Sequence, residues 1–280
     1  MNLLTDLLSG LMPFDWLEPA FMRRALIGML FIAPACAAMG VQVVSFRMAF
    51  FSDAISHSAF TGVALGLIFG INSHWTMVGF GVLVGCGVLV FSRKAVLSTD
   101  TVIGVFFAAV VALGIVIVSA RRGLSRYFES VLFGDILAID SNELWIMFFL
   151  FLLVFLFQAI GYNKLLLISL HSPLAHSRGI KPARWEIAYG ILLAFLVMIS
   201  LRAVGLLLVT ALLVVPAAAA RNLARSGSGL IWWSVLIATI SAGVGLFLSY
   251  IWGSATGATV ILVSVFFFIC SYLIRLVMGR

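Results

Sequence analysis

The chain has 280 residues, of which 64% are apolar and 10% are charged, and its formal net charge is +7. Ordinary globular domains are about 25% charged, so this chain has too few polar side chains to cover a water-soluble surface. Its cations stand at the ends of apolar runs, which is typical of membrane proteins and not of a nucleic-acid-binding groove. Composition therefore excludes a soluble fold and predicts a membrane protein without a nucleic-acid partner.

The first twenty residues carry three acidic side chains and no cation. This is the wrong charge pattern for a secretory signal peptide. Leucines recur at helical spacing from Leu3 to Leu11, ahead of Pro13. We therefore expect an interfacial helix within residues 1–20 that lies along the membrane surface.

Long apolar runs follow one another along the rest of the chain. They are continuous, which excludes the alternating ten-residue strands of a membrane β-barrel. The sequence predicts an all-α, polytopic helical membrane protein of eight to nine transmembrane helices, forming a single domain over residues 1–280. The expected spans are 25–45, 50–70, 75–92, 101–119, 142–160, 184–202, 204–222, 230–250 and 257–276.

The distribution of Lys and Arg over the loops predicts the orientation of these spans. With the C-terminus in the cytoplasm, eleven cations lie inside and six outside. Because cytoplasmic loops carry the excess of Lys and Arg, this orientation is favoured. It places the loop 163–183 in the cytoplasm and the acidic N-terminal segment outside.

Asp53 and His57 stand four positions apart within an otherwise apolar run, so both side chains share one helix face. Ionisable residues at membrane depth are costly and commonly mark a substrate pathway. A carboxylate and an imidazole together suit Zn²⁺ or Mn²⁺. An ion pair between helices, or an acid stabilising the helix N-terminus, explains the same spacing without a metal.

Two ligands do not complete a tetrahedral metal site. If this helix lined the axis of a two-fold dimer, two copies of Asp53 and His57 would supply four ligands. We state this geometry as a hypothesis.

The loop 163–183 contains a second candidate functional segment. A short helix is expected from Ser172, with Pro173 at its first position and Gly179 past its end. Such a capped helix on a cytoplasmic loop suits docking, although an ordinary solvated connector would look the same. His171 and His176 are five positions apart, which does not place them on one helix face for metal binding.

Catalytic motifs are missing from the sequence. It contains no G-x-x-x-x-G-K-[ST] phosphate loop, no H-E-x-x-H motif and no nucleophile elbow. The three cysteines, Cys36, Cys86 and Cys270, have no C-x-x-C spacing and are interpreted as small apolar residues. The chain is therefore not expected to be an enzyme, and no permanently bound cofactor is expected.

Several segments resemble the permeases of bacterial ABC transporters that import zinc or manganese. The strongest is RMAFFSDAISHSAFTGVALG, and four others follow in the same order over nearly the whole chain. They are STDTVIGVFFAAVVALG at 98–114, VLFGDILAID at 131–140, SPLAHSRGI at 172–180 and VGLLLVTALLVVPAAAARNLARS at 204–226.

The resemblance implies a type II ABC importer permease in the bacterial plasma (inner) membrane. It implies a homodimer, a cytoplasmic ABC ATPase dimer that hydrolyses ATP, and an extracytoplasmic metal-binding protein. It also implies that Asp53 and His57 hold the metal in transit. The family's coupling helix maps onto Ser172–Gly179, including Pro173, Leu174 and Ala175. Many members carry an acidic pair early in that helix, whereas this segment has no carboxylate.

A secondary transporter of the cation-diffusion-facilitator type is the alternative, because such proteins also use Asp and His four positions apart. It would be expected to carry a second intramembrane acidic or His pair, and the sequence has none. The sequence leaves zinc, manganese and iron open as the transported ion.

Overall fold

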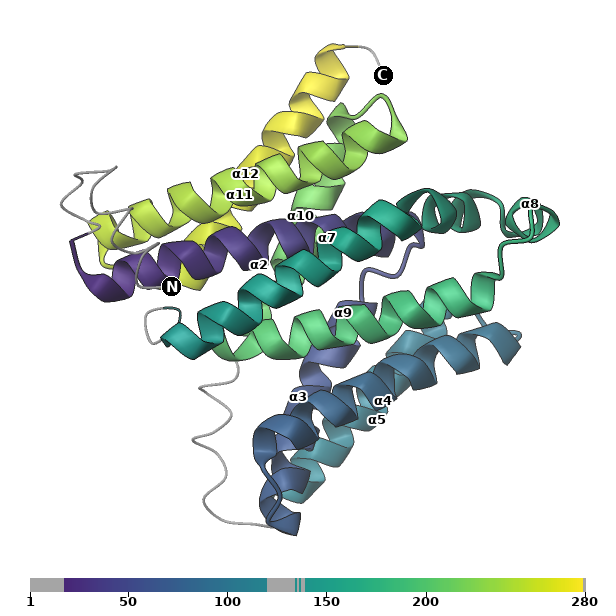
Figure 1. Ribbon diagram of the computed structural model, residues 1–280, viewed down its shortest axis with the longest axis horizontal. Helices are drawn as coiled ribbons and strands as arrows, with labels where there is room; N and C mark the ends of the chain where they lie inside the picture. The colour runs from purple at the N-terminus through teal and green to yellow at the C-terminus, as the bar shows by residue number, and fades with distance from the viewer. Residues whose placement is uncertain (1–17, 120–133, 135, 137–138, 279–280) are drawn as a thin grey trace. The chain divides into compact units, whose positions relative to one another are not determined.

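The structure is a computed structural model that describes residues 18–119, 134, 136 and 139–278 (Figure 1). Every regular element in these residues is helical. Each predicted span lies on a long helix, whereas the expected interfacial helix and most of the segment 131–140 lie outside the described residues. The helices are α2 (Ala20–Ser45), α3 (Phe51–Phe69), α4 (Ser73–Lys94), α5 (Thr99–Ser119), α7 (Ser141–Leu170), α8 (Ser172–Ser177), α9 (Pro182–Val204), α10 (Leu206–Leu223), α11 (Gly227–Trp252) and α12 (Thr256–Val277).

Eight helices of the described residues are long and apolar enough to cross a membrane, which agrees with the predicted eight to nine. The remaining long helix, α3, is not among them. It carries both Asp53 and His57, together with several serines and a threonine. These polar side chains lower its apolar character and distinguish α3 from the other long helices.

The chain divides into two compact units. Unit 1 comprises residues 1–41, 135–156 and 203–280, and unit 2 comprises residues 42–134 and 157–202. In unit 1, α10 packs against α11 and α12. The buried Ser234 hydroxyl donates to the Ala37 carbonyl at 3.0 Å and so joins α11 to α2.

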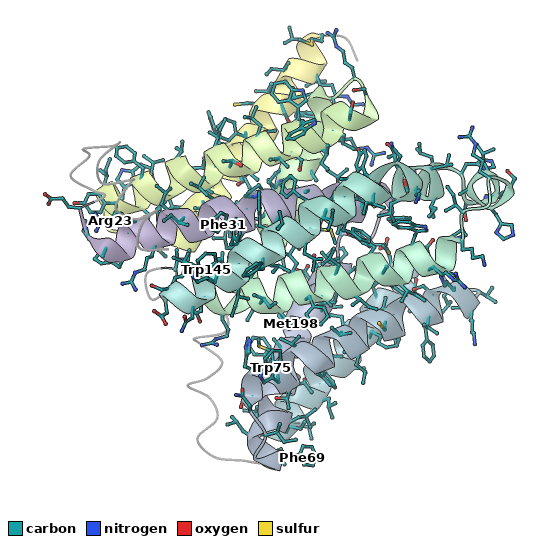
Figure 2. All side chains as sticks on the ribbon, viewed as in Figure 1. Arg23, Phe31, Phe69, Trp75, Trp145 and Met198 are labelled. Atoms are coloured by element: carbon teal, nitrogen blue, oxygen red, sulfur yellow. The ribbon has the colours of Figure 1, made fainter. Side chains whose placement is uncertain are left out.

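In unit 2, α3 packs against α4 and α5 (Figure 1). Glycines allow this close approach: a Cβ on Gly62 would lie 2.6 Å from the Met77 Cα atom, and Gly66 meets the first turn of α4. Gly81 faces the side chain of Met198 on α9, which is labelled in Figure 2. Gly70 has another role, because its φ of +67° ends α3 in the left-handed conformation.

The break between α2 and α3 sets where α3 begins. Arg47 adopts a φ of +57°, a conformation that costs a non-glycine residue about 1–3 kcal/mol. The Met48 amide donates to the Val43 carbonyl at 2.9 Å, which is the six-to-one bond of a Schellman-type helix end. The chain therefore turns at Arg47 and starts a new helix at Phe51, two residues before Asp53.

A reciprocal amide pair joins α2 to α7 inside unit 2. Gln42 donates to Gln158 at 2.8 Å, and Gln158 donates back to Gln42 at 2.9 Å. Both side chains are buried. Because each amide satisfies the other, the pair can lie within an apolar helix contact without leaving an unpaired polar group.

Aromatic side chains mark two levels on α11 of unit 1. Trp232 and Trp252 are both exposed and are twenty positions apart, which corresponds to about 30 Å of helix, the thickness of a hydrocarbon core. Tryptophan is enriched at membrane interfaces. Arg221 and Arg225 come shortly before the end of α11 that carries Trp232. Arg275 lies at the same end, because its guanidinium donates a hydrogen bond to the Asn222 side chain.

In unit 2 most of the described cations also lie at one end, with Arg202 in the last turn of α9 as an exception. Arg93 and Lys94 end α4, and Lys164, Lys181 and Arg184 lie where α7 ends and α9 begins. The α3–α4 turn at the opposite end exposes Phe69 and Trp75, labelled in Figure 2. Within each unit, the larger group of described cations therefore marks the end expected to face the cytoplasm.

Candidate functional site

Asp53 lies in the first turn of α3. The residue before the helix, Phe50, offers no side-chain cap, so the helix N-terminus has backbone amides whose partial positive charge favours a nearby carboxylate. The side chain is neither fully buried nor fully exposed. A carboxylate at this position is stabilised by the helix N-terminus and is only partly buried.

His57 follows one turn later and is also half-buried. Its ring lies 5.0 Å from the Phe107 ring and 5.8 Å from the Phe60 ring, measured between centroids. Asp53 and His57 interact electrostatically, as their common helix face predicts. With Phe60 they form a half-buried stripe at helical spacing along α3.

One side of this stripe is bounded by α5. The Thr61 hydroxyl donates to the Val110 carbonyl at 2.9 Å, and Gly114 lies against the same hydroxyl. This bond fixes α5 beside α3 one turn beyond His57. Thr61 and Phe107 were not predicted as site residues, although the row of hydroxyl side chains in α3 was visible in the sequence.

The donor set of a single chain is small. In the part of the chain that the structure describes, no group of three or more His, Cys, Asp or Glu side chains could hold a metal ion. Asp53 and His57 thus remain the two candidate ligands that the sequence predicted, without a third such side chain beside them in the described residues. A four-coordinate ion at this site needs ligands from water, backbone oxygens or a second copy of the chain.

The short helix expected in the loop 163–183 is α8. Its Pro173 stands in the first turn, and the Leu174 amide donates to Nδ1 of His171 at 3.2 Å. Gly179 has a φ of +76°, and the Ile180 amide closes onto the Ala175 carbonyl at 3.1 Å. Ala175 is buried, whereas Ser172, Pro173 and Leu174 are exposed. His171 is thus a cap, a role that the sequence did not reveal.

Residues 18–275 match the ABC 3 transport family. The chain belongs to this family. One relative, the manganese import system permease protein ScaB of Streptococcus gordonii, is 31% identical over 97% of this chain and 96% of its own length. Another, the high-affinity zinc uptake system membrane protein ZnuB of Haemophilus influenzae, is 32% identical over 92% of this chain and 97% of its own.

Among solved structures, this ABC 3 chain is similar to PsaBC from Streptococcus pneumoniae in complex with Fab. The TM-score is 0.78 at 27% identity, with coverage of 95% of this chain and 94% of that one. The predicted all-α fold of an ABC importer permease is therefore confirmed, as is the family resemblance.

Membership of the ABC 3 transport family also decides two broader expectations. With its apolar helices, the chain is a multi-pass protein of the bacterial inner membrane. The family is one of transporters, in line with the expectation that this chain is not itself an enzyme. The cation-diffusion-facilitator alternative is not favoured, because the match covers nearly the whole chain.

Proposed function

We propose that this chain is the membrane subunit of an ATP-driven importer of a divalent transition metal, manganese or zinc. The observation that carries the proposal is the half-buried pair of Asp53 and His57 on one face of α3. Relatives over nearly the whole chain are named as manganese and zinc import permeases. A carboxylate and an imidazole suit both ions.

In this proposal the metal is the transported substrate, and Asp53 and His57 hold it in transit. The carboxylate supplies charge, and the unprotonated imidazole supplies a nitrogen ligand. The protein forms a homodimer in which two α3 helices face each other, so that two pairs provide four ligands. The aromatic rings of Phe60 and Phe107 restrict water beside the ion and strengthen its attraction to Asp53.

The energy for transport comes from ATP hydrolysis by partner subunits. The exposed residues of α8 dock against a cytoplasmic ABC ATPase dimer, and an extracytoplasmic metal-binding protein delivers the ion at the opposite membrane face. The absence of a phosphate loop from the sequence agrees with ATP hydrolysis on another chain. Because α8 has no carboxylate, its contact with the ATPase uses hydroxyl, apolar and basic groups.

The donor set fits zinc and manganese differently. Two Asp and two His complete a tetrahedral zinc site, whereas manganese would take additional oxygen ligands from water or backbone. Iron shares much of this preference, so competition between ions has to distinguish the three.

Uptake in proteoliposomes tests the proposed function. The permease co-purified with its ATPase should accumulate radioactive manganese or zinc only when ATP and the metal-binding protein are supplied. Unlabelled manganese, zinc and iron, added in turn as competitors, then identify the preferred ion. Uptake driven by an ion gradient without ATP, or purification without an ATPase, would contradict the proposal.

A further inference from the structure

We propose that Glu186 and Arg93 are positioning residues that couple α8, through α4, to the helix α3, which carries Asp53 and His57. The inference rests on the proposed function, in which α8 docks against an ATPase. It assigns the mechanical connection to one ion pair between α9 and α4. All residues involved belong to unit 2.

The first part of the connection is formed by the two helix ends that flank α8, namely the end of α7 and the start of α9. The helix α7 is 30 residues long, about 45 Å, and so exceeds a hydrocarbon core of about 30 Å. Its last turns lead through α8 into α9, as Figure 1 shows. A displacement of α8 therefore moves the end of α7 and the start of α9.

Trp185 holds these two ends together. Its ring packs onto Gly161, where a Cβ atom would lie 2.7 Å from the indole. The Lys164 ammonium lies 4.3 Å from the centre of the same ring, within cation–π range. Phe157 adds a third contact from α7, at 6.0 Å between ring centroids. The start of α9 thus follows the end of α7.

The next residue, Glu186, reaches a different helix. Its Oε2 atom accepts from Nη2 of Arg93 at 2.6 Å and from Nε at 3.1 Å. Both donors of the guanidinium converge on this one oxygen, in a charge-assisted contact that is shorter and stronger than a neutral hydrogen bond. Arg93 lies in the last turn of α4, so this ion pair links the start of α9, which follows α8, to α4.

Close packing carries the connection from α4 and α9 to α3. One turn along α9, Gly190 faces Leu89 of α4 and Phe51 of α3. One turn before Leu89 on α4, a Cβ atom placed on Gly85 would lie 3.4 Å from the side chain of Ile55 on α3. Asp53 stands between Phe51 and Ile55 in the sequence. Movement of α4 therefore shifts the turn of α3 that bears Asp53.

The ion pair is suited to this task because its contact is short, while its two side chains remain partly exposed to solvent. The side chains of Arg93 and Glu186 are 32% and 21% exposed. Reversing one charge consequently buries no isolated ion, and the helices can still pack. The effect to expect is a loss of coupling between ATP hydrolysis and transport, with the fold retained.

Charge reversal tests the inference. In the reconstituted complex of permease and co-purified ATPase, Glu186→Arg or Arg93→Glu should lower metal uptake per ATP hydrolysed by about tenfold. The double reversal should restore this ratio, because the pair forms again with its charges exchanged. Lys94→Glu, a charge reversal one residue beyond Arg93, is the matched control and should leave the ratio at the wild-type value.

Two milder variants distinguish a loss of coupling from a loss of folding. Glu186→Gln keeps the side-chain shape, Arg93→Gln shortens the side chain, and each removes one charge without creating a like-charge pair, so both should lower the ratio less than the reversals do. An unchanged ratio in all four single variants, or a double reversal no better than either single, would overturn the inference. A wild-type complex without ATP-dependent uptake would instead contradict the proposed function.

Discussion

At the residue scale, α3 carries an acid and a histidine one turn apart on the same face. Asp53 benefits from the helix N-terminus, and His57 lies against aromatic rings. The helix-dipole interpretation and the metal-transit proposal both fit this placement, so mutation has to separate them.

Removal of either side chain tests the transit proposal. Asp53→Ala or His57→Ala should abolish metal uptake while the homodimer and its ATPase remain assembled, because neither side chain is needed to fill the core. Uptake and co-purification are measured on the same preparations. Asp100→Ala, which removes an exposed acid from the first turn of α5, is the control and should transport normally.

A structural role for the pair predicts the opposite order of damage. Breaking a buried ion pair costs about 3–5 kcal/mol, so assembly would fail before transport. Normal uptake by a well-folded Asp53→Ala or His57→Ala variant would refute the transit proposal.

Acidification should weaken metal binding at this site. A histidine binds metal only when its imidazole is unprotonated, and free histidine titrates near about 6.5. Calorimetry on the purified permease should therefore show weaker binding at about pH 5.5 than at about pH 7.5. His57→Asn should flatten this dependence. If the pH profile stays unchanged in that variant, His57 is not a ligand.

At the element scale, the contact between α3 and α4 depends on glycines that let the two helix backbones approach each other. A Cβ at Gly62 would meet backbone atoms of Met77, which cannot rotate away. Gly79, on α4 itself, has open space where its Cβ would be. The two positions form a matched pair for testing this packing.

Gly62→Ala should therefore destabilise the protein by about 1–3 kcal/mol, the usual cost of overpacking. Gly79→Ala should be neutral or slightly stabilising, because alanine favours the helix by up to about 1 kcal/mol. Thermal unfolding of both variants in detergent provides the comparison. Equal stability of the two variants would show that this helix contact adjusts more freely than the structure indicates.

Orientation in the membrane is a property of the whole molecule. In each unit most of the described cations lie at one end, and α8 stands at that end of unit 2. Because positive charge favours the cytoplasmic side, that end should lie inside the cell, where an ATPase can reach it.

Cysteine labelling at Ser177 measures this orientation. Ser177 is exposed on α8, and Ser177→Cys should react with a membrane-impermeant thiol reagent only after the cells are opened. A cysteine in place of Ser254, in the exposed turn after α11, should react in intact cells. The reverse labelling pattern would invert the proposed topology.

The sequence by itself determined the membrane class, the positions of the long helices and the pairing of Asp53 with His57. These follow from local quantities: apolar run length, cation position and the helical period. Pro173 and Gly179 likewise marked α8 through the conformations that they favour. Gly62, Gly66 and Gly70 share one spacing in the sequence, but the first two pack against α4 whereas Gly70 ends α3.

Only the tertiary structure decided which distant side chains meet. Trp185 and Glu186 are neighbours in sequence, yet one contacts α7 and the other contacts α4. Gln42 and Gln158 pair across more than a hundred residues. Phe107 of α5 packs against His57, and Thr61 of α3 bonds to α5. Such contacts depend on how helices pack side by side, and a helix period specifies the face of a residue but not its partner.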